Sequence, residues 1–205
     1  MIAIIDYDAG NLKSVEKALK YVGEEAVITR DMKQILSADK VILPGVGHFG
    51  DAMKKLHYYQ LVEVLKEVVQ KDIPLLGICL GLQLLFERSD ECDGVPGLSI
   101  LKGEILRIPD SAERKVPHMG WNSLSVKKDA RLYQGVPDQS YVYFVHSYYL
   151  QAKDKNIVAA TTHYGTLIDA SVEQGNVFAC QFHPEKSGEV GLAILKNFAG
   201  LQVLC

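Results

Sequence analysis

The 205-residue sequence lacks the features that mark disulfide-rich, membrane-spanning and nucleic-acid-binding proteins. It has only 4 cysteines, none in a Cys-x-x-Cys pair, so we expect neither a zinc site nor a dithiol redox centre. The longest uncharged stretch near the middle, residues 73–86, is too short to cross a bilayer. The 22 basic and 25 acidic side chains leave a net charge of −3, which gives no sequence-wide attraction to nucleic acid or anionic lipid.

The first residues also lack the pattern of a secretory signal peptide. Asp6 and Asp8 interrupt the apolar run that starts at Ile2 before a signal-peptide core can form. We therefore expect a cytoplasmic protein with free thiols, because the cytosol is a reducing compartment, and no association with a membrane.

The sequence does contain alternating strand and helix patterns in its first half. Apolar runs predict strands, and apolar residues at helical spacing predict helices; the strands are 2–5, 26–28, 41–43 and 73–78, and the helices 12–22, 61–69 and 82–88. Such alternation is typical of a parallel sheet covered on both faces. The second half is mostly strand-like, at 100–108, 141–150, 158–164, 167–173 and 177–182, with a hairpin turn at 174–176 and a helix around 190–198.

These patterns predict an α/β fold. We expect a mostly parallel central sheet with helices on both faces, extended by antiparallel strands. No internal repeat, linker or low-complexity tract interrupts the chain, so we expect residues 1–205 to form a single domain.

Cys79 is the strongest candidate for a nucleophile. It stands in Gly77-Ile78-Cys79-Leu80-Gly81, between a predicted buried strand and a predicted helix. This is the thiol counterpart of the Gly-x-Ser-x-Gly turn, in which glycines relieve crowding around the nucleophile. The helix that follows favours the thiolate, and the backbone amide of Leu80 can face an oxyanion. The alternative is a buried cysteine that only packs, as we expect for Cys180.

His183 is the best-placed base for this thiol. It follows the predicted strand 177–182 and is followed by Pro184, which ends the strand ladder, and by Glu185. In an extended segment, residues two apart point the same way, so Glu185 can hold one ring nitrogen while the other faces Cys79. The alternative is an ordinary polar turn.

The segment Pro44-Gly45-Val46-Gly47 also follows a predicted strand. Strands of a parallel sheet end at one edge, so Gly45 and Gly47 should lie near Cys79. Glycines let a backbone turn its amides toward an anion, and with Leu80 they can bind the oxygen of a tetrahedral intermediate. The alternative is a simple strand-to-helix turn.

Together these motifs resemble the triad-type (class I) glutamine amidotransferases. Residues 77–83 (Gly-Ile-Cys-Leu-Gly-Leu-Gln) are similar to the nucleophile motif of that family, and His183-Pro184-Glu185 to its His/Glu motif. Residues 6–12, 44–49 and 117–122 further resemble the glutaminase subunits of imidazole glycerol phosphate synthase, which act in histidine biosynthesis.

The resemblance implies that the protein hydrolyses L-glutamine to glutamate and ammonia with a Cys79/His183/Glu185 triad. Gln83 and the backbone of Ser147 and Tyr148 would hold the glutamine head group. It implies neither a metal nor a cofactor.

The resemblance also implies a partner, because a separate (β/α)₈-barrel cyclase subunit would use the ammonia in a heterodimer. Candidate contacts with that subunit are Asn11, Trp121, Asn122 and Lys186. Three alternatives remain open. The chain could be the glutaminase of anthranilate, pyridoxal phosphate or purine synthesis, a partner-independent cysteine hydrolase, or a binding module in which Cys79 only packs.

Overall fold

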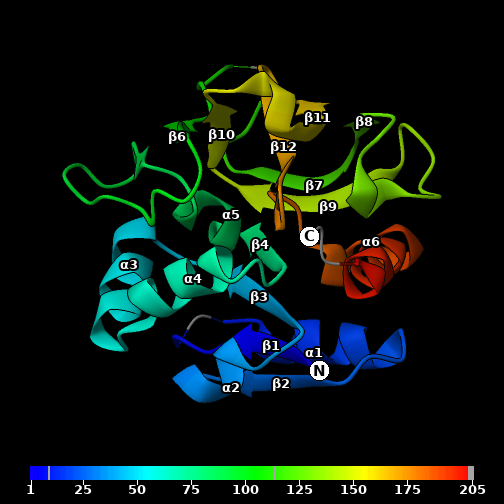
Figure 1. The fold of residues 1–205 in the computed structure, drawn as a ribbon. Helices are drawn as coiled ribbons and strands as arrows, with labels where there is room; N and C mark the ends of the chain where they lie inside the picture. The colour runs from blue at the N-terminus through cyan, green and yellow to red at the C-terminus, as the bar shows by residue number, and fades with distance from the viewer. Residues whose placement is uncertain (9, 113, 203–205) are drawn as a thin grey trace.

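The computed structural model describes residues 1–8, 10–112 and 114–202 (Figure 1). Its central sheet has eight strands in the order β2-β1-β3-β4-β13-β12-β11-β8. These strands are β1 (Ile2–Ile5), β2 (Ala26–Thr29), β3 (Lys40–Gly45), β4 (Leu75–Cys79), β8 (Ser125–Val126), β11 (Val158–His163), β12 (Leu167–Gln174) and β13 (Val177–Cys180). The strands from β2 to β13 in this order pair in parallel, and β12, β11 and β8 continue antiparallel. The predicted α/β class with an antiparallel extension is confirmed.

Helices cover both faces of this sheet, as predicted, because alternate side chains of its strands are apolar on both sides. Ala3 and Ile5 of β1 pack in one buried cluster with side chains of α2 (Met32–Leu36), α3 (Phe49–Tyr58) and α4 (Leu61–Gln70). Ile2 and Ile4 pack in a second cluster with α1 (Leu12–Tyr21) and α6 (Gly188–Gly200). The sheet therefore lies between two apolar layers.

Two smaller sheets lie beyond the parallel part of the central sheet (Figure 1). One joins β10 (Tyr148–Ala152), β6 (Gly103–Arg107) and β5 (Arg88–Ser89), and the other pairs β7 (His118–Ser123) with β9 (Tyr141–His146). Three 3₁₀ turns complete the described elements: η1 (Arg131–Tyr133), η2 (Lys155–Ile157) and η3 (Pro184–Lys186).

The expectation of one strand over residues 141–150 is wrong. The chain forms β9 and β10 there, and the two strands belong to different sheets. Ser147 separates them, with His146 paired to β7 and Tyr148 paired to β6. The apolar and aromatic pattern runs through both strands without a turn signal, so the sequence pattern does not show the change of sheet.

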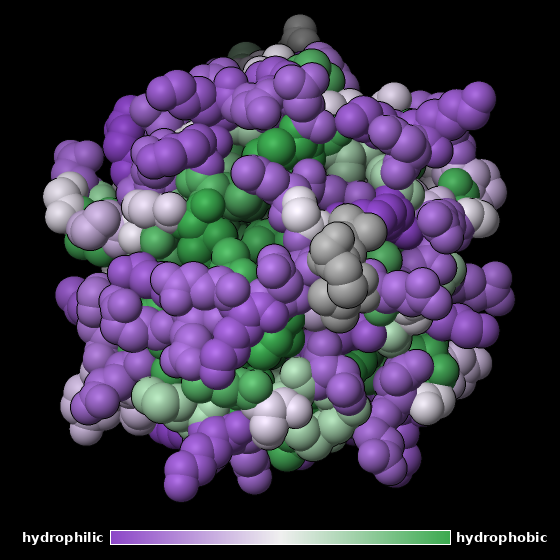
Figure 2. Space-filling view, viewed as in Figure 1, coloured by the Kyte–Doolittle hydropathy of each residue, from purple (hydrophilic) through white to green (hydrophobic). Residues whose placement is uncertain are grey.

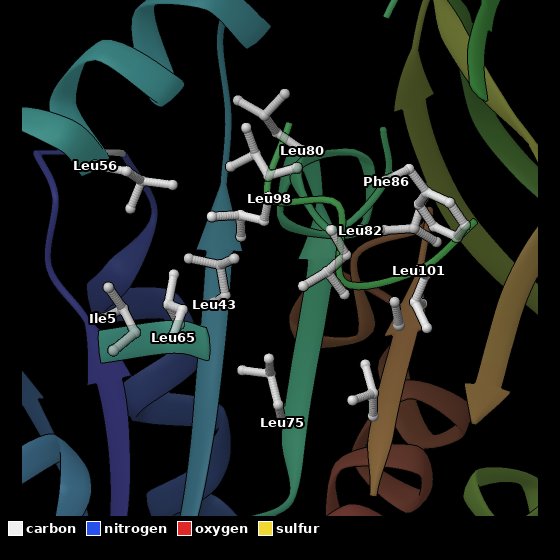
Figure 3. Close-up of a cluster of buried hydrophobic side chains, with 14 of the residues drawn as sticks. Ile5, Leu43, Leu56, Leu65, Leu75, Leu80, Leu82, Phe86, Leu98 and Leu101 are labelled. Atoms are coloured by element: carbon white, nitrogen blue, oxygen red, sulfur yellow. The ribbon is translucent and has the colours of Figure 1, made fainter. Parts of the chain in front are cut away.

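The helix expected at 82–88 is instead α5 (Leu80–Leu84), which starts at the nucleophile candidate and is shorter than predicted. The helix ends because its last carbonyl oxygens accept hydrogen bonds from a later loop and not from a further helical turn. Leu98 donates its backbone N–H to the Leu84 oxygen, and Ile100 donates its N–H to the Leu85 oxygen, just after the helix. Because residues 98–101 belong to this loop, the strand expected at 100–108 starts later, as β6. Figure 3 shows Leu80 beside Leu98 in the apolar cluster under this turn.

Hydrophilic side chains cover most of the face in Figure 2, and apolar colour is concentrated in its middle, over α5 and β4. On β7, Met119 and Trp121 stand out as exposed large apolar residues. Within the described ranges, no helix combines the length and the apolar character needed to cross a membrane.

Candidate active site

Cys79 lies at the sharp turn where β4 passes directly into α5. Its φ of 55° and ψ of −110° are unfavourable for a residue with a Cβ atom, so the backbone is strained at the thiol. A Cβ on Gly81 would lie 1.9 Å from the carbonyl oxygen of Leu43, and a Cβ on Gly77 would lie 2.8 Å from that of Gly81. The packing of this turn therefore requires both glycines, as the motif predicts.

His183 lies just beyond β13, the strand next to β4, so both residues leave the same edge of the sheet. Its Nδ1 is 2.8 Å from Oε1 of Glu185, and both side chains are buried. The predicted contact is confirmed, but its backbone route differs from the expected extended segment. Pro184 starts the 3₁₀ turn η3, which folds Glu185 back toward the imidazole ring.

The backbone around His183 is fixed to β9. His183 donates its N–H to the Tyr143 oxygen at 3.0 Å. Ser187 donates its hydroxyl to the His183 oxygen at 2.7 Å and accepts the Tyr143 N–H at 2.9 Å. These bonds hold the histidine in place without using its ring.

The pKa of His183 is raised to about 9. Burial acts to lower this pKa, but the nearby Cys79 sulfur and the Glu185 carboxylate raise it by more. Nε2, the ring nitrogen opposite the one held by Glu185, is buried without a hydrogen bond of ordinary geometry to the described residues. It is therefore the nitrogen available for proton exchange with the sulfur.

Cys79 and His183 line one cavity of about 400 Å³. Most of the residues expected to bind substrate line it too: Gly47, Leu80, Gln83, Ser147 and Tyr148. Gly47 has a φ of 98°, which favours glycine. Gly45 lies within β3 instead, where a Cβ atom would be 2.5 Å from the Tyr7 hydroxyl oxygen, so its immediate role is close packing.

The expected partner-facing residues divide into two groups. Trp121 is 55% exposed, which agrees with an interface position, and Lys186 lines the cavity. Asn11 donates its side-chain amide to Oε1 of Glu185, and Asn122 donates its amide to the His163 oxygen at 3.1 Å. The side chains of both asparagines are therefore engaged within the chain itself.

Three polar residues near the nucleophile were missed by sequence reasoning. Glu91 lines the cavity and accepts the Phe49 N–H at 2.7 Å, although no motif surrounds it. His146 also lines the cavity, and the side chain of Gln181 is hydrogen-bonded to the sulfur of Cys79. For Gln181, the sequence offered one signal of a place near the nucleophile: it stands two residues before His183, in the predicted strand 177–182.

His146 belongs to a buried histidine pair. Its Nε2 is 2.9 Å from Nδ1 of His118, and its own Nδ1 is 2.8 Å from the carbonyl oxygen of Tyr148. The His118 ring is stacked against Tyr164, with ring centroids 3.9 Å apart. Burial lowers the pKa of His118 to about 4 and that of His146 to about 3, so both rings are neutral at neutral pH.

The two other cysteines that the structure describes, Cys92 and Cys180, have no such setting. Cys180 is fully buried in the second apolar cluster, and burial raises its pKa, so the expectation that it packs is confirmed. Cys92 packs partly buried against the first cluster. Cys205 lies outside the described residues.

Comparison with known proteins fits this geometry. Residues 3–200 match the family model described as glutamine amidotransferase class-I. The chain belongs to this family. Imidazole glycerol phosphate synthase subunit HisH of Bacillus cereus (strain G9842) is 55% identical over 201 residues, 98% of this chain and 95% of that protein. The same subunit from Caldanaerobacter subterraneus subsp. tengcongensis is 53% identical over 205 residues, 100% of both chains.

Two solved structures have the same fold. The chain of a crystal structure of glutamine amidotransferase has a TM-score of 0.75 at 21% identity, with 97% of this chain and 100% of that chain covered. The structure of PurLQS from Thermotoga maritima has a TM-score of 0.73 at 20% identity, with 97% and 96% covered. With the likeness to HisH over its whole length, the chain is a glutamine amidotransferase of the imidazole glycerol phosphate synthase type.

Proposed function

We propose that Cys79 is the nucleophile of glutamine hydrolysis, with His183 as acid and base and Glu185 as the group that orients His183. The observation that carries this proposal is one cavity that brings Cys79 and His183 together, with Glu185 hydrogen-bonded behind the imidazole. A strained thiol, an imidazole and a buried carboxylate in this order suit nucleophilic cleavage of an amide.

In the first half of the proposed reaction, the Cys79 thiolate attacks the side-chain amide carbon of glutamine. Negative charge develops on the amide oxygen. The proposed donors to this oxygen are backbone amides at Leu80 and in the Gly45–Gly47 loop, and a well-placed donor is worth about 3 kcal/mol. His183 gives its Nε2 proton to the amide nitrogen, the carbon–nitrogen bond breaks, and ammonia leaves a γ-glutamyl thioester on Cys79.

In the second half, water cleaves the thioester. Nε2 of His183 takes a proton from the water, the hydroxide attacks the thioester carbon, and the carbon–sulfur bond breaks to give glutamate. The sulfur leaves as a thiolate beside an imidazolium, which is the starting pair. Throughout, Glu185 stabilises the imidazolium from the Nδ1 side.

The cavity also supports a binding mode for the amino-acid head group. Gln83 uses both hydrogens of its amide nitrogen, toward the Tyr148 oxygen at 3.1 Å and Oε1 of Gln181 at 3.0 Å, so Oε1 is the atom left to meet substrate. Ser147 and Tyr148 line the same cavity, and we propose that their backbone also contacts the head group. The Glu91 carboxylate supplies the charge that an α-ammonium group needs.

We further propose that this single domain, residues 1–205, works in the cytoplasm as a heterodimer with a (β/α)₈-barrel cyclase subunit that consumes the ammonia. The exposed apolar pair Met119 and Trp121 on β7 supports a docking surface there, and Lys186 lies at the cavity. Asn11 and Asn122 are the remaining candidates. Ammonia released between the two active sites would reach the cyclase before bulk water protonates it.

The experiment is a synthase assay with the co-expressed cyclase, driven by glutamine or by ammonia. We expect Cys79→Ala to abolish glutamine-driven synthesis and to leave ammonia-driven synthesis intact, and His183→Ala to do nearly the same. Cys92→Ala, outside the cavity, is the matched control and should keep both activities. Full glutamine use by Cys79→Ala would exclude the proposed triad.

A further experiment separates the remaining alternatives. The gene should restore growth of a histidine auxotroph that lacks the glutaminase subunit, which the glutaminases of other pathways would not do. Cleavage of esters or peptides without the cyclase, at rates matching those for glutamine, would favour a partner-independent hydrolase instead.

A further inference from the structure

We infer that Gln181 is a catalytic residue of the proposed glutamine hydrolysis, donating a hydrogen bond from its side-chain amide to the Cys79 sulfur and stabilising the thiolate. The inference rests on the proposed role of Cys79. It adds to the triad a neutral donor that touches the reacting atom.

The sheet places Gln181 beside the nucleophile. β13 and β4 pair in parallel with Cys180 opposite Ile78, so the next residues along, Gln181 and Cys79, leave the two strands at the same level. The backbone N–H of Gln181 donates to the Ala170 oxygen at 2.8 Å, which continues the pairing with β12. Its side chain is fully buried, and its Nε2 is 3.8 Å from Sγ of Cys79.

The orientation of the Gln181 amide follows from a backbone carbonyl. The Tyr148 oxygen can only accept a hydrogen bond, so the atom of Gln83 that lies 3.1 Å from it must be the nitrogen. The second hydrogen of this nitrogen points to Gln181, which must present its oxygen at 3.0 Å. The Gln181 nitrogen is therefore the atom that faces the sulfur, and the buried chain of bonds fixes the donor.

The alternative partners of the sulfur favour different states. The Val145 carbonyl oxygen lies 4.0 Å from Sγ and can accept only from the neutral thiol. An amide N–H gives a stronger hydrogen bond to a charged acceptor than to a neutral one, so Gln181 favours the thiolate.

Other titratable groups act on the sulfur from the neighbouring strands. Tyr7 lies after β1 and Cys180 in β13, and burial raises the pKa of each, so both stay neutral at neutral pH. His183 has a raised pKa and carries positive charge at neutral pH. Glu91, Lys186 and the neutral His146 also line the cavity around the sulfur. Gln181 thus adds a neutral donor to the groups that favour the anionic sulfur, which include His183 and the start of α5.

The test measures the rate of Cys79 alkylation by iodoacetamide against pH, located by mass spectrometry, in the full chain and in Gln181→Met. Methionine keeps the length of the side chain and removes the donor. We expect the pH of half-maximal alkylation to rise by about one unit, and kcat/KM for glutamine at neutral pH to fall by about tenfold. Gln151→Met, on the exposed side of β10, is the matched control and should change neither quantity.

Three outcomes separate the inference from the proposed function. An unchanged alkylation profile in a folded Gln181→Met that still labels at Cys79 would overturn the role of Gln181 alone. Absence of labelling at Cys79 in the unaltered chain, or full activity of Cys79→Ala, would overturn the proposed function itself. If Gln181→Met does not fold, Gln181→Asn applies the same test, because its shorter amide cannot reach the sulfur.

Discussion

Asn11 and His183 share one acceptor atom, Oε1 of Glu185. The side-chain amide of Asn11 donates to this oxygen, and Nδ1 of His183 is 2.8 Å from it. Asn11 directly precedes α1 and has a φ of 74°. The start of the first helix is thus connected to the proposed catalytic base through a single carboxylate.

This connection predicts that Asn11→Ala slows hydrolysis without weakening substrate binding. Loss of the donor leaves His183 as the described side chain that still holds Glu185, so the imidazole is less well oriented. We expect kcat for glutamine to fall by about tenfold and KM to stay within about twofold, because an oriented base matters in the transition state. Steady-state assays of the co-expressed enzyme give both values, with Asn197→Ala, on α6, as the control. A change confined to KM would contradict this reading.

Gly81→Ala should destabilise the chain severely. A Cβ at this position would lie 1.9 Å from the Leu43 oxygen, which belongs to the backbone of β3 and cannot move away alone. We expect a loss of about 3 kcal/mol or more in the free energy of unfolding, measured by urea denaturation. Gly200→Ala, where no atom lies within 4 Å of an added Cβ, is the matched control. A loss below about 1 kcal/mol would show that α5 shifts easily.

The pH profile of hydrolysis should have an alkaline limb near the pKa of His183, which is about 9. Because this pKa is raised, the imidazole keeps its proton through neutral pH and loses it above about 9. Without that proton the histidine cannot protonate the departing nitrogen, so kcat/KM falls. Assays from pH 6 to 10.5, with circular dichroism to check that the chain stays folded, test this. A limb near the ordinary histidine pKa would contradict it.

Stability should fall in acid through the His118–His146 pair. Both pKa values are lowered, to about 4 and about 3, so below the ordinary value of about 6.5 the unfolded chain takes up protons that the folded chain does not. The free energy of unfolding then drops by up to about 1.4 kcal/mol per pH unit for each histidine. His183 opposes this slope near neutral pH, because its raised pKa keeps it protonated in the folded chain while the unfolded chain becomes protonated only below about 6.5; at lower pH it is protonated in both states and adds little slope.

Urea denaturation at pH 6, 5.5 and 5 measures this slope. His118→Phe keeps a ring that can stack on Tyr164 and removes one of the two titrating groups, so its slope should be about half as steep. An equal slope in the variant would assign the acid sensitivity to other groups.

The sequence predicted the parts of the site that depend on local chemistry. Gly77 and Gly81 flank Cys79 because the turn has no room for side chains, and this steric requirement acts within five residues. The pairing of His183 with Glu185 is also local, although the 3₁₀ turn that produces it was not predicted. Parallel strands end at a common edge, which is why residues as distant as Cys79 and His183 could be placed together.

The missed features depend on contacts between distant segments. Nothing around Glu91 indicates that its loop folds against Phe49, and nothing in residues 141–150 indicates that the chain changes sheets at Ser147. The short α5 ends where backbone N–H groups of residues 98–101 donate to the last carbonyl oxygens of the turn. Helical spacing of apolar residues does not show these hydrogen bonds. Gln181 was missed because the contact that matters is with Cys79 at the end of the neighbouring strand, β4.

The position of β13 in the sheet has a consequence for biosynthesis. This strand lies between β4 and β12 and brings Gln181 and His183 to the sulfur, yet it follows all the other described strands in the sequence. A nascent chain that has emerged only through β12 holds the thiol without its base. On the proposed mechanism, the capacity to release ammonia is therefore acquired only after β13 and His183 have been synthesised.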